Sequence, residues 1–207
     1  MDFRMQSGAM RRFIDIAFAI FWLIITAPVL VLIAILIRVD SPGSVFYSPQ
    51  MVGHHGKEFA LLRFRTMFPQ ADHPGKEQSL TRTGRMLRNY SLDHLPQLIN
   101  LLKGDLTIIG PRPMERNVVK IQEPVWQQYF QVKPGLFNYA VLKLGKSWTP
   151  SRNTNPDLNQ ELELEFQQRR STAADLQLFV RFVRKFLLSR GNIKARGEPD
   201  PKDETER

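Results

Sequence analysis

The chain has 207 residues, enough for one globular domain with a real hydrophobic core and for a membrane anchor besides. Its 29 lysines and arginines outnumber its 20 aspartates and glutamates by 9, so either its surface is simply basic or its partners are anionic. The chain has no cysteine, which excludes disulfides, thiolate catalysis and cysteine-ligated zinc, and its four histidines do not form the HExxH pattern of zinc proteases.

An uncharged apolar run extends from Ile16 to Ile37. As a helix it would be about 33 Å long, enough to cross a hydrocarbon core of about 30 Å. A cleaved signal peptide is a poorer interpretation, because the run is too long for one and no A-x-A site follows it. The run therefore predicts contact with a membrane.

Pro28 interrupts this run near its middle. Inside a helix, proline removes one hydrogen bond and clashes with the carbonyl of Ile24. In lipid the freed carbonyl needs another donor, and we expect the Thr26 hydroxyl to be a candidate. Pro28 is therefore the predicted break in the membrane segment.

Basic residues flank both ends of the run, and such flanks tend to stay in the cytoplasm. Two interpretations remain open: a hairpin that enters and leaves by the same face, and a kinked single span. A soluble buried helix is a distant third. The flanking residues are Arg11, Arg12 and Arg38.

Short elements follow the run, separated by turn signals. In chain order, as far as residue 113, we expect a turn at 41–43, β-prone stretches at 45–47 and 59–64 with a loop at 53–57, a loop at 69–83, a helix at 85–89, a helix at 94–103 that ends at Gly104, a buried strand at 106–109 and a rigid non-helical loop at 110–113.

The C-terminal third is expected to be more helical. Its predicted elements are a helix within 118–131 whose start is blurred by Pro124, a turn at 133–135, an extended stretch at 137–144, a polar loop at 149–159, a charged helix at 160–170, a last helix at 174–190 and a polar, disordered tail at 191–207. The last helix fits either an interfacial amphipathic helix or a helix packed on the core with a solvated basic face.

The densest cluster of chemically useful side chains surrounds Asp93. Pro96 is tolerated only in the first turn of a helix, which places the helix cap at or near Asp93. A carboxylate there accepts backbone N–H groups and faces the positive helix end, and both effects favour its ionised form. Asp93 is therefore either a nucleophile or a plain N-cap.

The neighbours of Asp93 add further candidates. His94 is interpreted as a surface residue, a metal ligand or a proton donor. Arg112 lies between two prolines, and its stiffly held guanidinium suits either phosphate binding or a structural salt bridge. Further positive potential for a diphosphate would come from Arg63, Arg65 and Arg88. No Walker A or GxGxxG loop is present.

Several short motifs occur in a specific order over residues 10–190. They are Arg12–Asp15 before the apolar run with its central proline, Ser41–Tyr47 with Gln50, Phe64–Met67, Arg88, Ser91–Asp93, Leu95–Leu98, Gly104–Leu106, Gly110–Pro113 and Pro134-Gly135. Together they resemble the bacterial sugar transferases, the monotopic polyprenyl-phosphate phosphoglycosyl transferases.

The resemblance implies transfer of a sugar phosphate from a nucleotide sugar, usually a UDP-sugar, to polyprenyl phosphate, which initiates polysaccharide or glycoconjugate assembly. Asp93 would attack the β-phosphate and form a phosphosugar–enzyme intermediate, with His94 in the catalytic pair. Arg88 and Arg112 match positions expected near the phosphates. Mg²⁺ would neutralise the diphosphate near Asp93, with a ligand set left open.

The resemblance also implies an α/β fold, mostly α with short strands. Residues 1–40 would form a re-entrant helix–break–helix in the bacterial inner membrane, and residues 41–190 a compact catalytic domain on the cytoplasmic face with amphipathic interfacial helices. Membrane lipid, polyprenyl phosphate and a nucleotide sugar are the expected partners. A homo-oligomer is compatible with the sequence, and a nucleic-acid partner is not expected because no such motif is found.

This chain departs from the family pattern in a few places. His94 stands where the family has glutamate, and neutral imidazole is a poor ligand for Mg²⁺. Within Leu136–Val141 only Ala140 fits the Gly-Trp-Ala-Gln stretch that usually follows Pro-Gly, and Arg63 replaces a lysine. These departures keep a second hypothesis open, a catalytically impaired member that acts as a membrane scaffold or partner subunit.

Overall fold

The computed structural model describes residues 3–69, 79–117, 119, 122–138 and the single positions 164, 177, 180 and 184. The predicted loop at 149–159 and tail at 191–207 lie outside these residues. So do the predicted helices at 160–170 and 174–190, except for the four single positions, which are helical.

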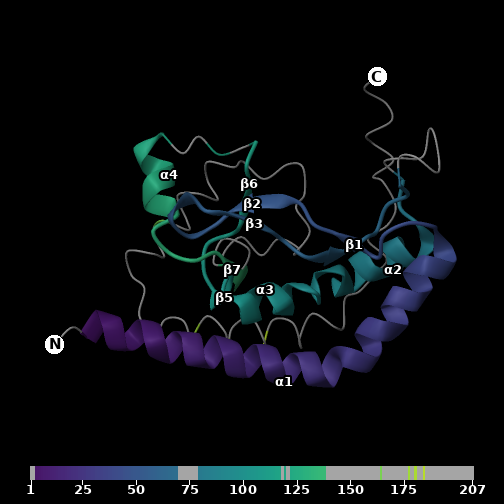
Figure 1. Ribbon diagram of the computed structural model, residues 1–207, viewed down its shortest axis with the longest axis horizontal. Coiled ribbons are helices and arrows are strands. Elements are labelled where there is room, and N and C mark those ends of the chain that lie inside the picture. Colours follow the sequence, from purple (N-terminus) through teal and green to yellow (C-terminus); the bar gives the residue numbers. More distant parts are fainter. Residues whose placement is uncertain are drawn as a thin grey trace.

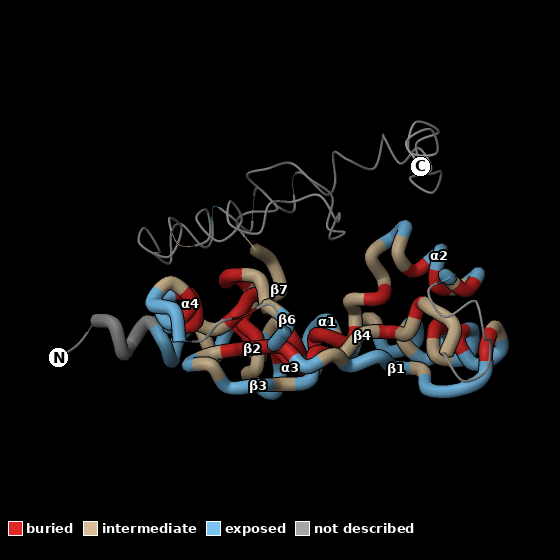
Figure 2. The backbone as a smooth tube through the Cα atoms, turned by 90° about the horizontal axis from the view of Figure 1, so that it is seen from above, coloured by how far each residue is buried: buried red, intermediate tan, exposed pale blue. Residues whose placement is uncertain are grey.

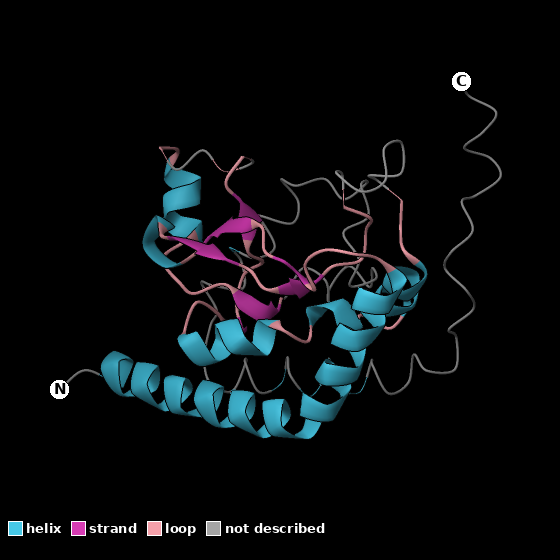
Figure 3. Ribbon diagram, turned by 45° about the vertical axis from the view of Figure 1, so that its right-hand side comes forward, coloured by secondary structure: helices cyan, strands magenta, loops and turns pink. Residues whose placement is uncertain are grey.

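The N-terminal part of the chain forms one long helix, α1 (Phe3–Asp40). It is continuous through Pro28 but bends sharply, so the predicted break is a bend within one helix (Figures 1 and 3). The Thr26 hydroxyl donates to the carbonyl of Trp22 at 2.6 Å, and the expectation that it would serve Ile24 is wrong. Such back-bonding from threonine, next to a proline, is a recognised cause of helix bending.

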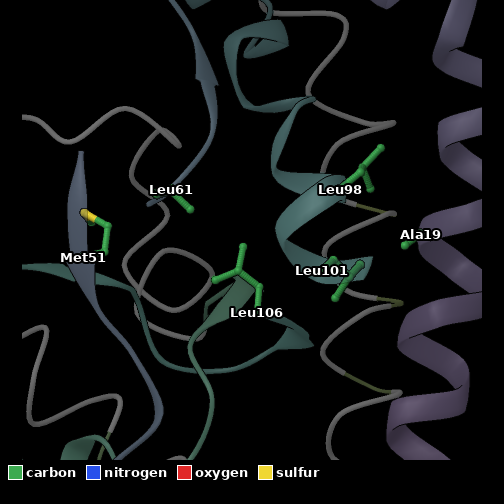
Figure 4. Close-up of a cluster of buried hydrophobic side chains, with 6 residues drawn as sticks. All are labelled: Ala19, Met51, Leu61, Leu98, Leu101 and Leu106. Carbon is green, nitrogen blue, oxygen red and sulfur yellow. The ribbon is translucent and has the colours of Figure 1, made fainter. Parts of the chain in front are cut away.

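The part of α1 before Pro28, here called the first arm, packs on α3 (Gln97–Lys103). Figure 4 shows α3 between α1, which contributes Ala19, and strand β2 (Gln50–Val52), which contributes Met51. This cluster is the main core, and its buried members are Ala19, Met51, Leu61, Leu98, Leu101 and Leu106.

The part of α1 after Pro28, the second arm, packs on a different cluster. Ile33 and Ile37 lie against Phe64 of β4 (Arg63–Phe64) and Leu87 of α2 (Arg82–Asn89). Because each arm has its own apolar partners, the bend at Pro28 allows one helix to cover both clusters.

The helices after α1 begin at positions that differ from those expected. Helix α2 begins at Arg82, three residues earlier than predicted, because Thr81 caps it and accepts the Gly84 N–H at 2.8 Å. The helix expected from His94 is a 3-10 turn, η2 (Leu92–His94), followed by α3 from Gln97. Helix α4 (Pro124–Tyr129) is shorter than predicted and starts at its proline.

The strands are short and form three small sheets. Strand β1 (Phe46–Tyr47) pairs with β4, β2 lies between β3 (Glu58–Ala60) and β6 (Met114–Glu115), and β5 (Thr107–Ile109) runs parallel to β7 (Gly135–Phe137). The expected stretch at 59–64 is divided between β3 and β4, and β2 and β6 were not predicted. The fold is a mixed α/β fold with a long apolar helix at its N-terminus.

Helix α1 is exposed along most of its length. Over Gly8–Asp40 it is long and apolar enough to cross a membrane, and only 11% of its most apolar stretch is buried inside the protein. The tube in Figure 2 shows buried segments near α1, α3 and the strands, and others at α4 and α2. A buried core helix would be mostly covered, so the soluble interpretation of this run does not fit.

Candidate functional site

Asp93 lies in η2, at the corner between α2 and α3. Ser91 has the left-handed conformation at φ 55°, ψ 28°, which is uncommon for a residue other than glycine and turns the chain out of α2. The residue at the N-cap of α3 is Pro96, and it makes no side-chain cap. The interpretation of Asp93 as the helix cap is therefore wrong.

The Asp93 side chain is 11% exposed, in a site that combines burial with positive charge. Burial raises the pKa of Asp93 above its ordinary value, while Arg63, its own backbone N–H and Arg88 act in the opposite direction. The expectation that the site favours the ionised form is therefore wrong in net direction. The arginines offset part of the cost of ionising a buried carboxyl group.

His94 is buried beside Asp93, with a side chain that is 14% exposed, so the surface interpretation is wrong. Its Nε2 lies 3.6 Å from Asp93 Oδ2, and its Nδ1 lies 2.9 Å from the side-chain nitrogen of Gln97. Burial and the charges of Arg63, Arg112 and Arg88 lower the pKa of His94 to about 3. His94 is therefore neutral at physiological pH.

Three of the four predicted arginines change the pKa of Asp93 or of His94 through their positive charge. Arg63 has the largest electrostatic effect on Asp93 among the arginines. Burial and the positive charge of Arg112 lower the pKa of the Arg63 guanidinium, while the negative charge of Asp93 raises it. Its Nε is buried without a hydrogen-bond partner among the described residues. Arg88 is held by a hydrogen bond from its Nε to the Thr66 hydroxyl at 3.0 Å.

Arg112 is held by the fold of its loop. The Tyr129 hydroxyl donates to the Arg112 carbonyl at 2.9 Å, and the Gly135 N–H donates to the Pro111 carbonyl at 2.8 Å. A Cβ on Gly110 or Gly135 would overlap the backbone of the other, so this close approach requires glycine. The ion pairs between residues in the described part of the chain do not include Arg112.

Arg65 is placed differently. Its guanidinium donates to the Ser41 carbonyl at 2.9 Å, to the Ser41 hydroxyl at 2.8 Å and to the Pro42 carbonyl at 2.6 Å. These bonds tie the turn after α1 to the strand region. They give Arg65 a structural role, and its contribution to positive potential for a diphosphate stays a prediction.

In the part of the chain that the structure describes, the donor groups around Asp93 do not suit a resident Mg²⁺. Among the described residues no three histidine, aspartate or glutamate side chains form a group that could hold a metal. Asp93 is one carboxylate beside a neutral imidazole, and the positive charges of Arg63, Arg88 and Arg112 oppose a divalent cation. Mg²⁺ remains a prediction from the resemblance.

The contact of Gln97 with His94 is not predicted by the sequence, although Gln97 lies within the motif Leu95–Leu98. The available signal was the spacing of three residues, which places both side chains on one face of a helical turn. Because Pro96 separates a 3-10 turn from α3, that spacing alone did not predict contact.

Comparison with known proteins identifies the family. The family described as bacterial sugar transferase matches residues 6–189. The chain belongs to the bacterial sugar transferase family. This confirms the predicted resemblance and the prediction of a transferase enzyme.

Relatives of this sugar transferase cover most of its length. It is 34% identical over 188 residues to the uncharacterized sugar transferase EpsL of Bacillus subtilis (strain 168), covering 88% of this chain and 89% of EpsL. It is 31% identical over 188 residues to the UDP-glucose:undecaprenyl-phosphate glucose-1-phosphate transferase of Caulobacter vibrioides, covering 86% and 69%. It is 28% identical over 208 residues to the exopolysaccharide production protein ExoY of Rhizobium meliloti (strain 1021), covering 89% and 88%.

Proposed function

We propose that this sugar transferase moves a sugar-1-phosphate from a UDP-sugar to polyprenyl phosphate through a covalent intermediate on Asp93. One observation carries the proposal: a buried carboxylate lies within the field of Arg63, Arg88 and, through His94, Arg112. The name of the Caulobacter relative states the same class of substrates, a UDP-sugar and undecaprenyl phosphate.

In the first step a carboxylate oxygen of Asp93 attacks the β-phosphorus of the UDP-sugar. The bond between that phosphorus and the bridging oxygen breaks, and UMP leaves with the electron pair. The sugar phosphate is then bound to Asp93 as an acyl phosphate. No proton is lost from the nucleophile, because Asp93 reacts as the anion.

In the second step a phosphate oxygen of the polyprenyl phosphate attacks the same phosphorus. The bond from phosphorus to Asp93 breaks, the carboxylate is regenerated, and the product is a polyprenyl diphosphate that carries the sugar. Both steps develop negative charge at phosphorus-bound oxygens, which guanidinium groups stabilise when they are already in place.

The bonds of Arg88 and Arg112 to the fold provide this preorganisation. The Thr66 hydroxyl holds Arg88, and the Tyr129 hydroxyl and the glycine pair hold the Arg112 loop. Arg63 adds a largely buried cation whose charge acts on the nucleophile. A diphosphate that enters this site loses its hydrogen bonds to water and gains hydrogen bonds to guanidinium groups that the fold already holds in place.

A same-side arrangement of α1 supports the delivery of a lipid phosphate. Arg12, near one end of α1, donates to the Leu101 and Leu102 carbonyls at 2.8 and 2.7 Å. Asp40, at the other end, accepts the Thr83 N–H at 2.7 Å. Both ends thus bond to the same globular body. A single span would carry one end, with that body, across the bilayer.

We therefore propose that α1 is re-entrant and lies with the catalytic body on the cytoplasmic face of the inner membrane. Its exposed side is apolar, with Phe13 70%, Ile24 70% and Val31 61% exposed. Lipid would cover that side. Asp93 would then lie near the headgroups, where a lipid phosphate is presented.

Substitution of the nucleophile tests the proposal. Asp93→Asn should reduce UMP release from a UDP-sugar to background, and Arg112→Ala should reduce kcat/KM by about 10²- to 10³-fold, as for loss of one preorganised donor. Glu58→Gln, which removes a carboxylate from an exposed ion pair with Arg116, is the matched control and should leave turnover unchanged. Turnover by Asp93→Asn at the wild-type rate would refute the covalent mechanism.

A second candidate function is a membrane scaffold or partner subunit. His94, where the family pattern has glutamate, is the observation that favours it. Screening UDP-sugars with Mg²⁺ and with Mn²⁺ distinguishes the two functions. UMP release by the wild type supports the transferase, whereas release by His94→Glu alone supports the scaffold.

A further inference from the structure

Two polar side chains next to Asp93, those of His94 and Gln97, take no part in the two proposed transfer steps. Gln97 is 4% exposed in the first turn of α3, and its side-chain nitrogen lies 2.9 Å from His94 Nδ1. The other ring nitrogen, Nε2, lies 3.6 Å from Asp93 Oδ2. The imidazole thus stands between an amide and the proposed nucleophile.

We propose that Gln97 holds His94 in the neutral tautomer protonated at Nε2, and that His94 thereby positions the Asp93 carboxylate for attack. This inference rests on the proposed function of Asp93. Gln97 and His94 are positioning residues in this arrangement, since neither has to touch the reacting phosphorus.

The tautomer follows from which atom donates at each end. The Gln97 amide nitrogen is a donor, so Nδ1 must present its lone pair to it. A neutral imidazole carries one proton, which is then on Nε2 and directed toward the carboxylate. The opposite tautomer would set the Nε2 lone pair against a carboxylate oxygen, with no proton between them.

The surroundings of the His94 imidazole keep it neutral. It is buried, and three guanidinium groups add positive charge around it, so a second proton is disfavoured. A neutral N–H next to Asp93 orients the carboxylate without adding a further charge to the site.

The Nε2–Oδ2 distance of 3.6 Å is longer than a formed hydrogen bond. Such contacts are often long before substrate is bound and tighten during the reaction. When His94 engages Oδ2, the second carboxylate oxygen is the one left to attack phosphorus. The role of the pair is therefore to select and orient the attacking oxygen.

The test reads the tautomer directly. The full-length protein, with ¹⁵N-labelled histidine in detergent micelles or nanodiscs, is compared by NMR with His94→Gln, which identifies the His94 ring signals among the four histidines. We expect the wild type to show a protonated Nε2 and an unprotonated Nδ1 near neutral pH. A wild-type His94 protonated at Nδ1 instead would overturn the inference.

Two substitutions at Gln97 change the donor while keeping the approximate shape. Gln97→Glu replaces the donor with an acceptor and should move the proton to Nδ1 or protonate both nitrogens. Gln97→Met removes the donor and should give mixed tautomers. Each should lower kcat by about tenfold or more, the size expected for loss of one positioning hydrogen bond, with KM changed less than about twofold.

Gln127→Glu makes the same charge change at an exposed position on α4, away from the site. It should alter neither the His94 ring shifts nor kcat. Unchanged ring shifts and unchanged kcat in Gln97→Glu would overturn the inference even if Asp93→Asn is inactive. Wild-type turnover by Asp93→Asn would instead refute the proposed function, while the ring shifts would still report whether Gln97 sets the tautomer. Gln97→Met keeps the test valid if Gln97→Glu fails to fold.

Discussion

At the scale of single residues, burial favours the neutral forms of Asp93 and His94, while the nearby arginines favour the charged form of Asp93 and the neutral form of His94. Burial raises the pKa of Asp93, and Arg63 is the first group that limits the rise. The same burial and the same cations keep His94 neutral. Sequence alone brought Asp93, Arg88 and Arg112 together as candidates, but the sign of each pKa shift depends on burial, which short motifs do not reveal.

The low pKa of His94, about 3, predicts how stability depends on pH. An unfolded histidine titrates near about 6.5, so between those values the unfolded state binds more protons. The wild type should therefore lose stability as pH falls from about 6.5, by up to about 1.4 kcal/mol per pH unit from this group. His94→Gln should lack this loss.

Thermal unfolding of both proteins in the same detergent, from pH 7.5 to 5, measures the difference. The difference in unfolding temperature should shift in favour of His94→Gln as the pH is lowered. Two curves that stay parallel over this range would contradict a buried neutral imidazole at position 94.

At the scale of elements, local sequence signals predicted most of the described helices, whereas the short strands depend on contacts between distant segments. Gly104, at φ 93°, ends α3 as expected, and Thr81 sets the start of α2. Strands β2 and β6 have only three and two residues, too few for a periodic pattern. They exist because β2 pairs with β6 on one side and with β3 on the other. Pairing between distant segments carries no local signal.

Asn100 shows how one buried side chain joins several elements. Its amide oxygen accepts the Leu62 N–H at 2.9 Å, and its amide nitrogen donates to the Ala60 carbonyl at 2.8 Å and to Asp105 Oδ2 at 3.0 Å. It therefore fixes α3, and with it the corner that holds Asp93, to the connection between β3 and β4.

Replacement of this link should destabilise the whole fold. Asn100→Leu keeps the approximate volume but leaves three polar groups without their partner, which should cost about 3 kcal/mol or more. The thermal midpoint should fall by several degrees, whereas Gln128→Leu, at an exposed position on α4, should change it little. An unchanged midpoint for Asn100→Leu would show that this hydrogen-bond network does not stabilise the fold.

At the scale of the whole molecule, a bent apolar helix lies beneath a body that bonds to both of its ends (Figure 1). The sequence left a hairpin and a kinked span open, because hydropathy and flanking arginines fit both. The bonds of Arg12 and Asp40 to the same body favour the proposed hairpin, and no short-range pattern in the sequence encodes them.

The proposed re-entrant topology predicts that both flanks of α1 are protected from the outside. The chain has no cysteine, so Gly8→Cys and Ser48→Cys each provide a single labelling site, one on either side of the apolar run. Neither should react with a membrane-impermeant maleimide in intact cells, and both should react after the cytoplasmic membrane is permeabilised. A periplasmic protein with a known free thiol controls for access of the reagent.

Labelling of either cysteine in intact cells would contradict the hairpin. If only one of the two reacted from outside, α1 would be a single span, and the bonds of Arg12 and Asp40 to one body would have to break in the membrane. Equal protection of Arg12 and Arg38 from external reagents is the corresponding expectation for the native flanks.

The central claim is that Asp93 becomes covalently bound to a sugar phosphate, and trapping that species tests it most directly. The protein is incubated with a panel of UDP-sugars in the absence of polyprenyl phosphate, quenched, and analysed by intact and peptide mass spectrometry. We predict a mass increase of one sugar phosphate that maps to Asp93, is absent in Asp93→Asn and disappears when polyprenyl phosphate is added. Release of UMP and formation of lipid product with an adduct on another residue would contradict the assignment of Asp93 as the nucleophile.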